Sequence, residues 1–244
     1  MHLRVVSWNV DSRPTGLLDA KVELLRQLRP DLALLQEIGR PVYRALLPHP
    51  SAHQRMHLKS RVFSWGALST DLCDRRASEY RLGCAVLGVP TTAVLDSSVL
   101  NRAPFDVRDP VRLGFLWRTV AARVALSTGA LITVCSVHGR PGASPPPPEL
   151  QRAFHAGIAG WLATVPGPII FGMDAGPPVL DGADPLLGSN PVHGLREVVR
   201  ASHDHMWATS DLEVLDVQCL ADEAATAGSD HALLLADLAL RTSC

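Results

Sequence analysis

Short apolar segments of β type recur along the whole 244-residue chain and leave few architectures open to it. Most contain four to eight residues and are bounded by Gly, Pro, Asp or Ser, a pattern that favours strands over helices. The turn at residues 127–129 predicts a hairpin between two of them. The predicted strands occupy residues 3–10, 31–38, 83–90, 119–126, 130–138, 167–174, 204–210, 212–220 and 231–240.

Two segments show helical periodicity instead. Apolar side chains recur at helical spacing over residues 17–28, and Pro30 ends that pattern. Residues 149–163 do the same, with Pro148 suited to the first helical position. The order of elements predicts one mixed α/β domain over residues 1–244, with many strands and few helices.

Composition narrows the class of protein. Apolar residues make up 47% of the chain, enough for a sizeable core, and the net charge of −1 gives no general reason for nonspecific DNA binding. The five cysteines form no C-x-x-C pair, which argues against a disulfide framework or a structural zinc site. We expect a cytoplasmic protein, because the chain shows no signal peptide and no apolar run of about 18 residues that could span a membrane.

Charge is distributed unevenly along the chain. Residues 55–123 carry eleven Arg or Lys against six Asp or Glu. This segment could form a positive face for a phosphate-bearing partner, and an arginine-rich solvated surface is an equal alternative. Arg118 precedes the predicted strand 119–126 and Arg123 lies within it, and both could bind phosphate. Surface arginines on a strand are the equal alternative.

Polar side chains stand at the ends of several predicted strands. Alone, each is more often a turn or strand-end residue, but rigid strands also present functional groups in this way. Seven side chains placed alike therefore indicate a site: Asn9, Glu37, His138, Asp174, Asp204, Asp230 and His231. The stretch SHDHM is a weaker candidate for a zinc cluster, because on a strand His203 and His205 would face away from Asp204.

The ordered set of motifs resembles the endonuclease/exonuclease/phosphatase superfamily, which has the DNase I-like fold. The motifs in order are SWNV, PDLALLQEI, RLGCAVLGV, SVHG, FGMDAG, GLREVV with HDHMWATSDLEVLDV, and GSDH. They span nearly the full length. The resemblance implies a four-layer α/β sandwich in which two mainly antiparallel sheets pack face to face with helices outside. It also implies that GLREVV is a late helix.

The resemblance further implies a role for each polar residue. Glu37 would bind a divalent cation, Mg²⁺ or alternatively Mn²⁺, with Asn9 and Asp230 completing or supporting the site. Asp174 would hold or deprotonate the attacking water. His231, oriented by Asp204, would contact the phosphoryl oxygen or transfer a proton, and His138 would donate to the phosphate or protonate the leaving group.

One motif departs from the family pattern. Gly176 stands where the family has an asparagine that positions the phosphate or water. Loss of one oriented donor can cost about 10²- to 10³-fold in rate. Asn190, or a backbone N–H freed by Gly176, could replace it, and Arg118 is a further candidate for substrate binding.

We therefore expect a monomeric, metal-dependent phosphoesterase that acts on a phosphodiester, with nucleic acid as a possible substrate. Two alternatives stay open. One is a phosphomonoesterase acting on a lipid, inositol or small-metabolite phosphate, and the other is a noncatalytic binding protein that retains the fold.

Overall fold

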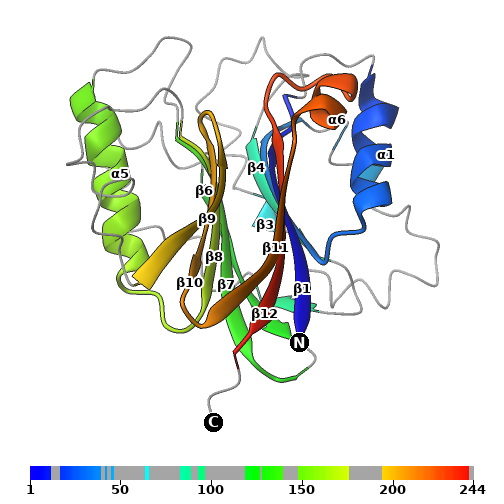
Figure 1. Ribbon diagram of the computed structural model, residues 1–244. Helices are drawn as coiled ribbons and strands as arrows, with labels where there is room; N and C mark the ends of the chain where they lie inside the picture. The colour runs from blue at the N-terminus through cyan, green and yellow to red at the C-terminus, as the bar shows by residue number, and fades with distance from the viewer. Residues whose placement is uncertain are drawn as a thin grey trace.

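The structure is a computed structural model that describes residues 1–11, 17–39, 42, 45–46, 64–65, 83–88, 93–96, 119–126, 128–139, 148–175 and 194–241. Two six-stranded sheets lie face to face in it, and the helices lie on the outside (Figure 1). Of the ten strand pairings among these residues, eight are antiparallel and two are parallel. The predicted sandwich of two mainly antiparallel sheets is confirmed.

Each sheet combines strands from distant parts of the chain. The first sheet contains, in spatial order, β11 (Leu212–Leu220), β12 (Leu233–Leu240), β1 (His2–Asn9), β2 (Leu32–Ile38), β4 (Gly83–Gly88) and β3 (Ser64–Trp65). The second sheet contains β5 (Ala93–Asp96), β6 (Thr119–Leu126), β7 (Leu131–His138), β8 (Ile169–Asp174), β10 (Asp204–Thr209) and β9 (Leu195–Ala201).

The two parallel pairings are crossovers that pass through the two long helices. Helix α1 (Leu18–Leu28) connects β1 to β2, and α5 (Pro148–Leu162) connects β7 to β8. Both helices agree with the sequence prediction. Parallel strands need such a long connection, because each must begin at the same edge of the sheet. None of the helices among the described residues is long and apolar enough to cross a membrane.

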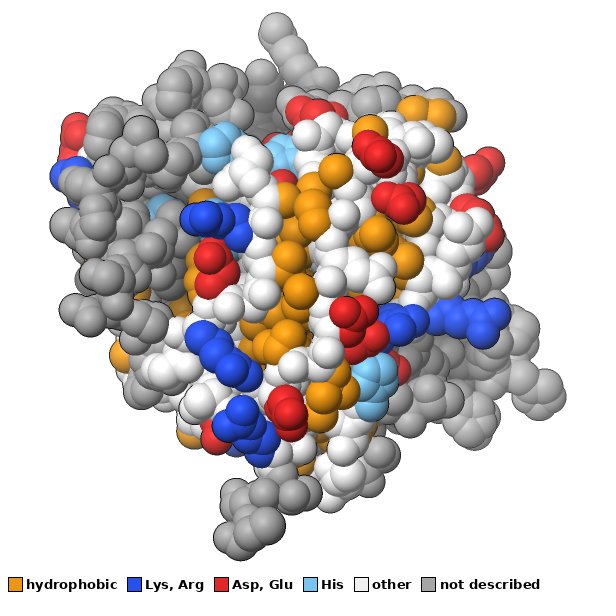
Figure 2. All heavy atoms as spheres, in the orientation of Figure 1, with side chains coloured by type: hydrophobic (Ala, Val, Ile, Leu, Met, Phe, Trp, Pro, Cys, Tyr) orange, Lys and Arg blue, Asp and Glu red, His pale blue; other side chains and the backbone are white. Residues whose placement is uncertain are grey.

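Three apolar layers hold this arrangement together. The central layer lies between the two sheets and includes Leu34, Val134 and Leu234. A second layer packs α5 against the face of the second sheet formed by β7, β8 and β10, through residues such as Phe154. A third layer packs α1 and α6 (Ala221–Thr226) against β1, β2 and β12. Figure 2 shows a strip of hydrophobic side chains over the middle of the viewed face.

Two sequence predictions about local structure have different outcomes. The hairpin is confirmed, because β6 and β7 pair and Gly129 takes a φ of 82° in the turn between them. The prediction of a late helix at GLREVV is wrong. Residues 195–201 form β9, whose backbone pairs with β10, and the β-branched Val198 and Val199 suit a strand.

Gly172 marks a point where the sheets approach too closely for a side chain. A Cβ at this position would lie 2.9 Å from the Cβ of Ser7 and 3.0 Å from Cδ1 of Leu34, both on the opposite sheet. We expect Gly172→Ala to lower the free energy of unfolding by about 1–3 kcal/mol, the usual cost of overpacking. Urea denaturation would measure the change.

Gly160 provides the matched control. A Cβ there would meet nothing within 4 Å, and the residue lies inside α5. Because alanine has the higher helix propensity, Gly160→Ala should stabilise the protein by about 0.5–1 kcal/mol. Equal effects of the two substitutions would contradict the close approach of the sheets at Gly172.

Candidate active site

The strand topology brings the predicted polar residues to one rim of the sandwich. Parallel strands end at the same edge of their sheet, so Asn9 lies beside the end of β2 and His138 lies directly opposite Asp174. β10 runs antiparallel to β8, which places its first residue, Asp204, opposite Asp174. His231 lies two residues before β12, the antiparallel neighbour of β1.

Asn9 and Asp174 form a hydrogen bond between the two sheets. Nδ2 of Asn9 donates to Oδ2 of Asp174 over 2.8 Å, and the same nitrogen lies 3.4 Å from Nε2 of His231. Both Asn9 and Asp174 are buried. The amide therefore holds the Asp174 carboxylate in one orientation beside the imidazole.

Asp204 orients His231 in the same rim. Nδ1 of His231 lies 3.1 and 3.0 Å from the two carboxylate oxygens of Asp204. Burial alone would lower the pKa of His231, but the hydrogen bond and charge of Asp204, aided by Asp174 and Asp230, outweigh it and raise the pKa to about 9. Burial raises the pKa of Asp204, although the contact with His231 opposes that shift.

Glu37 lies at an irregularity near the end of β2. The register between β2 and β4 shifts between Leu35 and Ile38, and Glu37 adopts a left-handed φ of 47°. Such bulges redirect a side chain and are common beside active sites. Oε1 of Glu37 lies 3.3 Å from Nε2 of His138, which also lies 3.4 Å from Oδ2 of Asp174. Two carboxylates thus converge on one imidazole.

A buried polar contact connects the two strands that carry Glu37 and His138. Nε2 of Gln36 donates to Oγ of Ser136 over 2.9 Å, and that hydroxyl donates to the Leu35 carbonyl over 2.9 Å. Both side chains are buried between the sheets. This contact aligns β2 with β7 directly below the rim.

The remaining predicted residues lie at the exposed edge of the rim, away from the rim, or outside the described residues. Asp230 is largely exposed, and its Oδ1 lies 3.7 Å from Nε2 of His231. Three predicted substrate-binding residues lie outside the described part of the chain: Arg118, Gly176 and Asn190. His205 is buried, binds Glu197 at 2.8 Å and stacks on Trp207, which gives it a structural role.

The rim offers two sets of donors to a cation. Asp174, Asp204 and His231 have potential ligand atoms within 4.8 Å of one another. However, Asp204 already occupies Nδ1 of His231, so this group serves better as a pair that orients an imidazole. Glu37 and Asp174 offer carboxylate oxygens that face Nε2 of His138, and a hard divalent cation prefers oxygen ligands. The chemistry of this second set fits Mg²⁺ or Mn²⁺.

Two residues near the rim were not singled out from the sequence. Ser229 accepts the backbone N–H of His231 on its Oγ and donates that hydroxyl to the Asn9 carbonyl, at 3.1 and 2.7 Å. Lys21 is fully buried below the rim on α1. A charged residue within the apolar face of a helix was the one sequence signal that could have identified Lys21.

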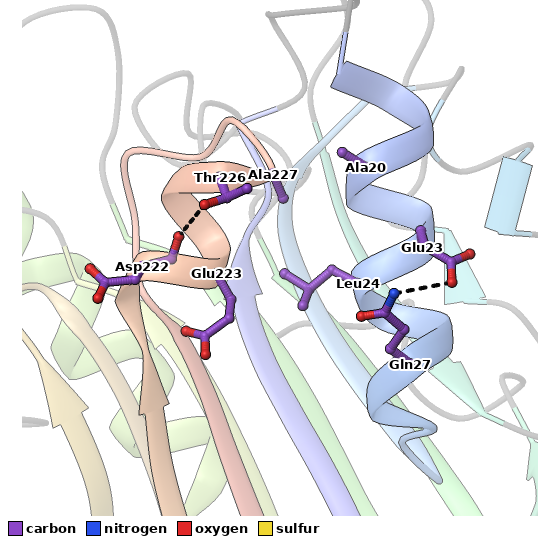
Figure 3. Close-up of a pocket in the computed structure, with 8 residues that line it drawn as sticks. All are labelled: Ala20, Glu23, Leu24, Gln27, Asp222, Glu223, Thr226 and Ala227. Carbon is purple, nitrogen blue, oxygen red and sulfur yellow. Dashed lines mark hydrogen bonds between the residues drawn. The ribbon is translucent and has the colours of Figure 1, made fainter.

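A groove between α1 and α6 is separate from this rim (Figure 3). Its volume is about 430 Å³. The lining contains three carboxylates, and two polar contacts stabilise its walls, Gln27 to Glu23 and Thr226 to the Asp222 carbonyl. None of the predicted site residues lines it.

Comparison with solved structures shows the same architecture over nearly the whole chain. The human Nocturnin catalytic domain with bound sulfate anion is 14% identical, with 98% of this chain and 95% of that chain covered at a TM-score of 0.72. D. rerio TDP2 complexed with single strand DNA product is 14% identical, with 98% and 99% covered at a TM-score of 0.67. The endonuclease/exonuclease/phosphatase from Bacteroides vulgatus is 13% identical, with 99% and 100% covered at 0.67.

The chain has the fold of the endonuclease/exonuclease/phosphatase superfamily. No protein-family model matches the chain, and no curated protein matches its sequence. The resemblance inferred from the motifs is thus confirmed at the level of the fold.

The raised pKa of His231 gives a pH dependence that can be measured. Because this pKa is higher in the folded protein than the ordinary 6.5, protonation favours folding. The contribution to stability is complete below pH 6.5 and is lost as the pH rises through about 9. In metal-free protein, histidine NMR should show a titration midpoint for His231 near pH 9.

Substitution of Asp204 should remove the upward shift in the pKa of His231. Asp204→Asn removes the charge that outweighs burial, so the pKa of His231 should fall to 6.5 or below. Asp19→Asn, an exposed carboxylate change on α1, should leave the midpoint in place. A wild-type midpoint near 6.5 would contradict the ion pair.

Proposed function

We propose that this protein is a divalent-metal-dependent phosphoesterase that hydrolyses a phosphodiester bond in the manner of a nuclease. The observation that carries the proposal is the convergence of two units at one rim. One is the Asp204–His231 pair, and the other is the carboxylate pair Glu37 and Asp174 on either side of His138. An anionic substrate needs a cationic donor and an activated water beside it. The imidazole of the first unit can supply the donor, and a carboxylate of the second can activate the water.

The Asp204–His231 pair is suited to the phosphoryl group. With Nδ1 engaged by Asp204, Nε2 of His231 is the ring nitrogen left to face the rim, near Asn9 and Asp174. The raised pKa keeps this imidazole protonated at neutral pH. A protonated Nε2 would donate to a nonbridging phosphate oxygen and stabilise the charge that develops there.

Asp174 is suited to orient or deprotonate the attacking water. Asn9 fixes one of its oxygens, and a carboxylate that is fixed in this way can direct a water molecule along one line of attack. His138, whose Nε2 faces both Glu37 and Asp174, would donate to the phosphate or protonate the leaving oxygen.

Glu37 is the proposed principal ligand of Mg²⁺ or Mn²⁺. A divalent cation at this position would neutralise charge on the phosphate ester. Oδ1 of Asn9 accepts the Asp11 N–H and keeps a second lone pair that a cation could use. Direct ligation of the cation by Asn9 stays a prediction. The exposed carboxylate of Asp230 would support the site from its edge.

Nucleic acid is the proposed substrate class. D. rerio TDP2, which shares the fold, was crystallised with a single strand DNA product, and the sulfate bound to human Nocturnin is a tetrahedral anion like a phosphate. The basic segment 55–123 and Arg118 would add phosphate contacts, and Gly176 or Asn190 would supply the missing donor. A monomeric state and a cytoplasmic location stay predictions.

Hydrolysis of bis-p-nitrophenyl phosphate and of single-stranded DNA tests the proposal. We expect turnover with Mg²⁺ or Mn²⁺ that EDTA abolishes. Glu37→Gln and His231→Gln should each lower kcat by about 10²- to 10⁴-fold, the range for loss of an electrostatic or acid–base group. Glu149→Gln, an exposed change on α5, is the charge-matched control and should retain full activity.

The other outcomes separate the alternatives. Activity on monoesters alone would replace the proposal with a phosphomonoesterase. Folded protein that turns over no ester on a broad panel would indicate a binding protein that retains the fold. Turnover that survives both EDTA and Glu37→Gln would contradict a role for the metal.

A further inference from the structure

Lys21 occupies a position where a charged side chain is costly. It lies on the inner face of α1 beside Val22 and Leu25, and its exposed fraction is 0%. Burial lowers the pKa of this lysine, although the charges of Asp11 and Asp230 oppose the shift. A buried ammonium is rarely retained unless it is fully engaged by acceptors.

The ammonium engages the backbone just after β1. Nζ donates to the Val10 carbonyl over 2.8 Å and also to the Asp11 carbonyl. Asp11 has a φ of 34°, in the left-handed region that non-glycine residues adopt only at a cost. Lys21 therefore stabilises a strained turn by satisfying two carbonyls that follow each other directly along the chain.

This turn determines how the Asn9 amide points. The Asp11 N–H donates to Oδ1 of Asn9 over 3.1 Å, so Nδ2 of the same amide is directed to Asp174. The Ser229 hydroxyl donates to the backbone carbonyl of Asn9, and its Oγ accepts the backbone N–H of His231. Hydrogen bonds that are linked through the backbone of residues 9–11 therefore connect Lys21 to the Asp174 side chain and to the His231 backbone N–H.

The choice of lysine is informative in this arginine-rich chain. The sequence contains 23 Lys and Arg in total, and only Lys21 and Lys59 are lysines. An ammonium is compact and has three donors in a tetrahedral arrangement, whereas a guanidinium is planar and wider. A compact group suits two adjacent carbonyls in a closed space.

We propose that Lys21 is a positioning residue of the active site, whose buried ammonium holds the Val10–Asp11 turn so that the Asn9 amide is oriented between Asp174 and His231. The inference rests on the proposed function for its effect on turnover. Its effect on the Asn9 amide is independent of any reaction.

NMR tests the positioning without substrate. With ¹⁵N-lysine labelling the chain has two side-chain signals, which Lys59→Arg would assign. We expect the Lys21 ammonium protons to exchange with water much more slowly than those of free lysine. In Lys21→Met, the side-chain amide signals of Asn9, assigned from Asn9→Asp, should shift and broaden. Rapid ammonium exchange in the wild-type protein would overturn the proposal even if Lys21→Met fails to fold.

Kinetics test the consequence for the reaction. Lys21→Met should lower kcat by about 10- to 100-fold with little change in KM, because misplacement of a reacting group by about 1 Å can cost 10²-fold. Lys21→Arg should recover part of this loss, and Arg26→Met, an exposed change on the same helix, should cause none. A folded Lys21→Met variant with wild-type kcat and unchanged Asn9 signals would overturn the proposal. Wild-type protein without turnover would instead contradict the proposed function and leave the NMR result to decide the role of Lys21.

Discussion

The hydrogen bond between Asn9 and Asp174 is the contact on which the organisation of the rim depends. It joins the last residues of β1 and β8, one from each sheet, and both side chains are buried. A buried carboxylate without a donor is costly, so this contact favours one alignment of the two sheets at the rim. Gln36 and Ser136 make a second polar contact between the sheets nearby, between β2 and β7.

The other pairs at the rim also cross the sandwich. Glu37 on the first sheet faces His138 on the second, and His231, just before β12, faces Asp204 on β10. His138 and Asp174 lie in the same sheet, but the Glu37 and His231 side chains that face them come from the opposite side of the sandwich. The site therefore exists only when the central apolar layer has formed, which couples the proposed chemistry to the packing of the two sheets.

Much of the fold could be predicted because the chain alternates short apolar strands with two amphipathic helices. The polar residues at strand ends were also recognisable, because strands must stop where the sheet meets solvent. The segment at 195–201 was predicted wrongly, since its helical or extended state depends on pairing with β10, a contact that local periodicity does not contain. The role of Lys21 was missed because its acceptors are backbone carbonyls, which any sequence supplies.

The sequence by itself determined the two long helices, most of the strands and their order, and the residues able to carry acid, base and ligand chemistry. Tertiary structure alone decided which of these residues meet. Asn9 and Asp174 are 165 positions apart, and Glu37 and His138 come from different sheets, so their contacts arise from parallel crossovers and sheet packing. The physical reason is that hydrogen bonds and ion pairs act over a few ångströms, a scale that only the packed sandwich sets.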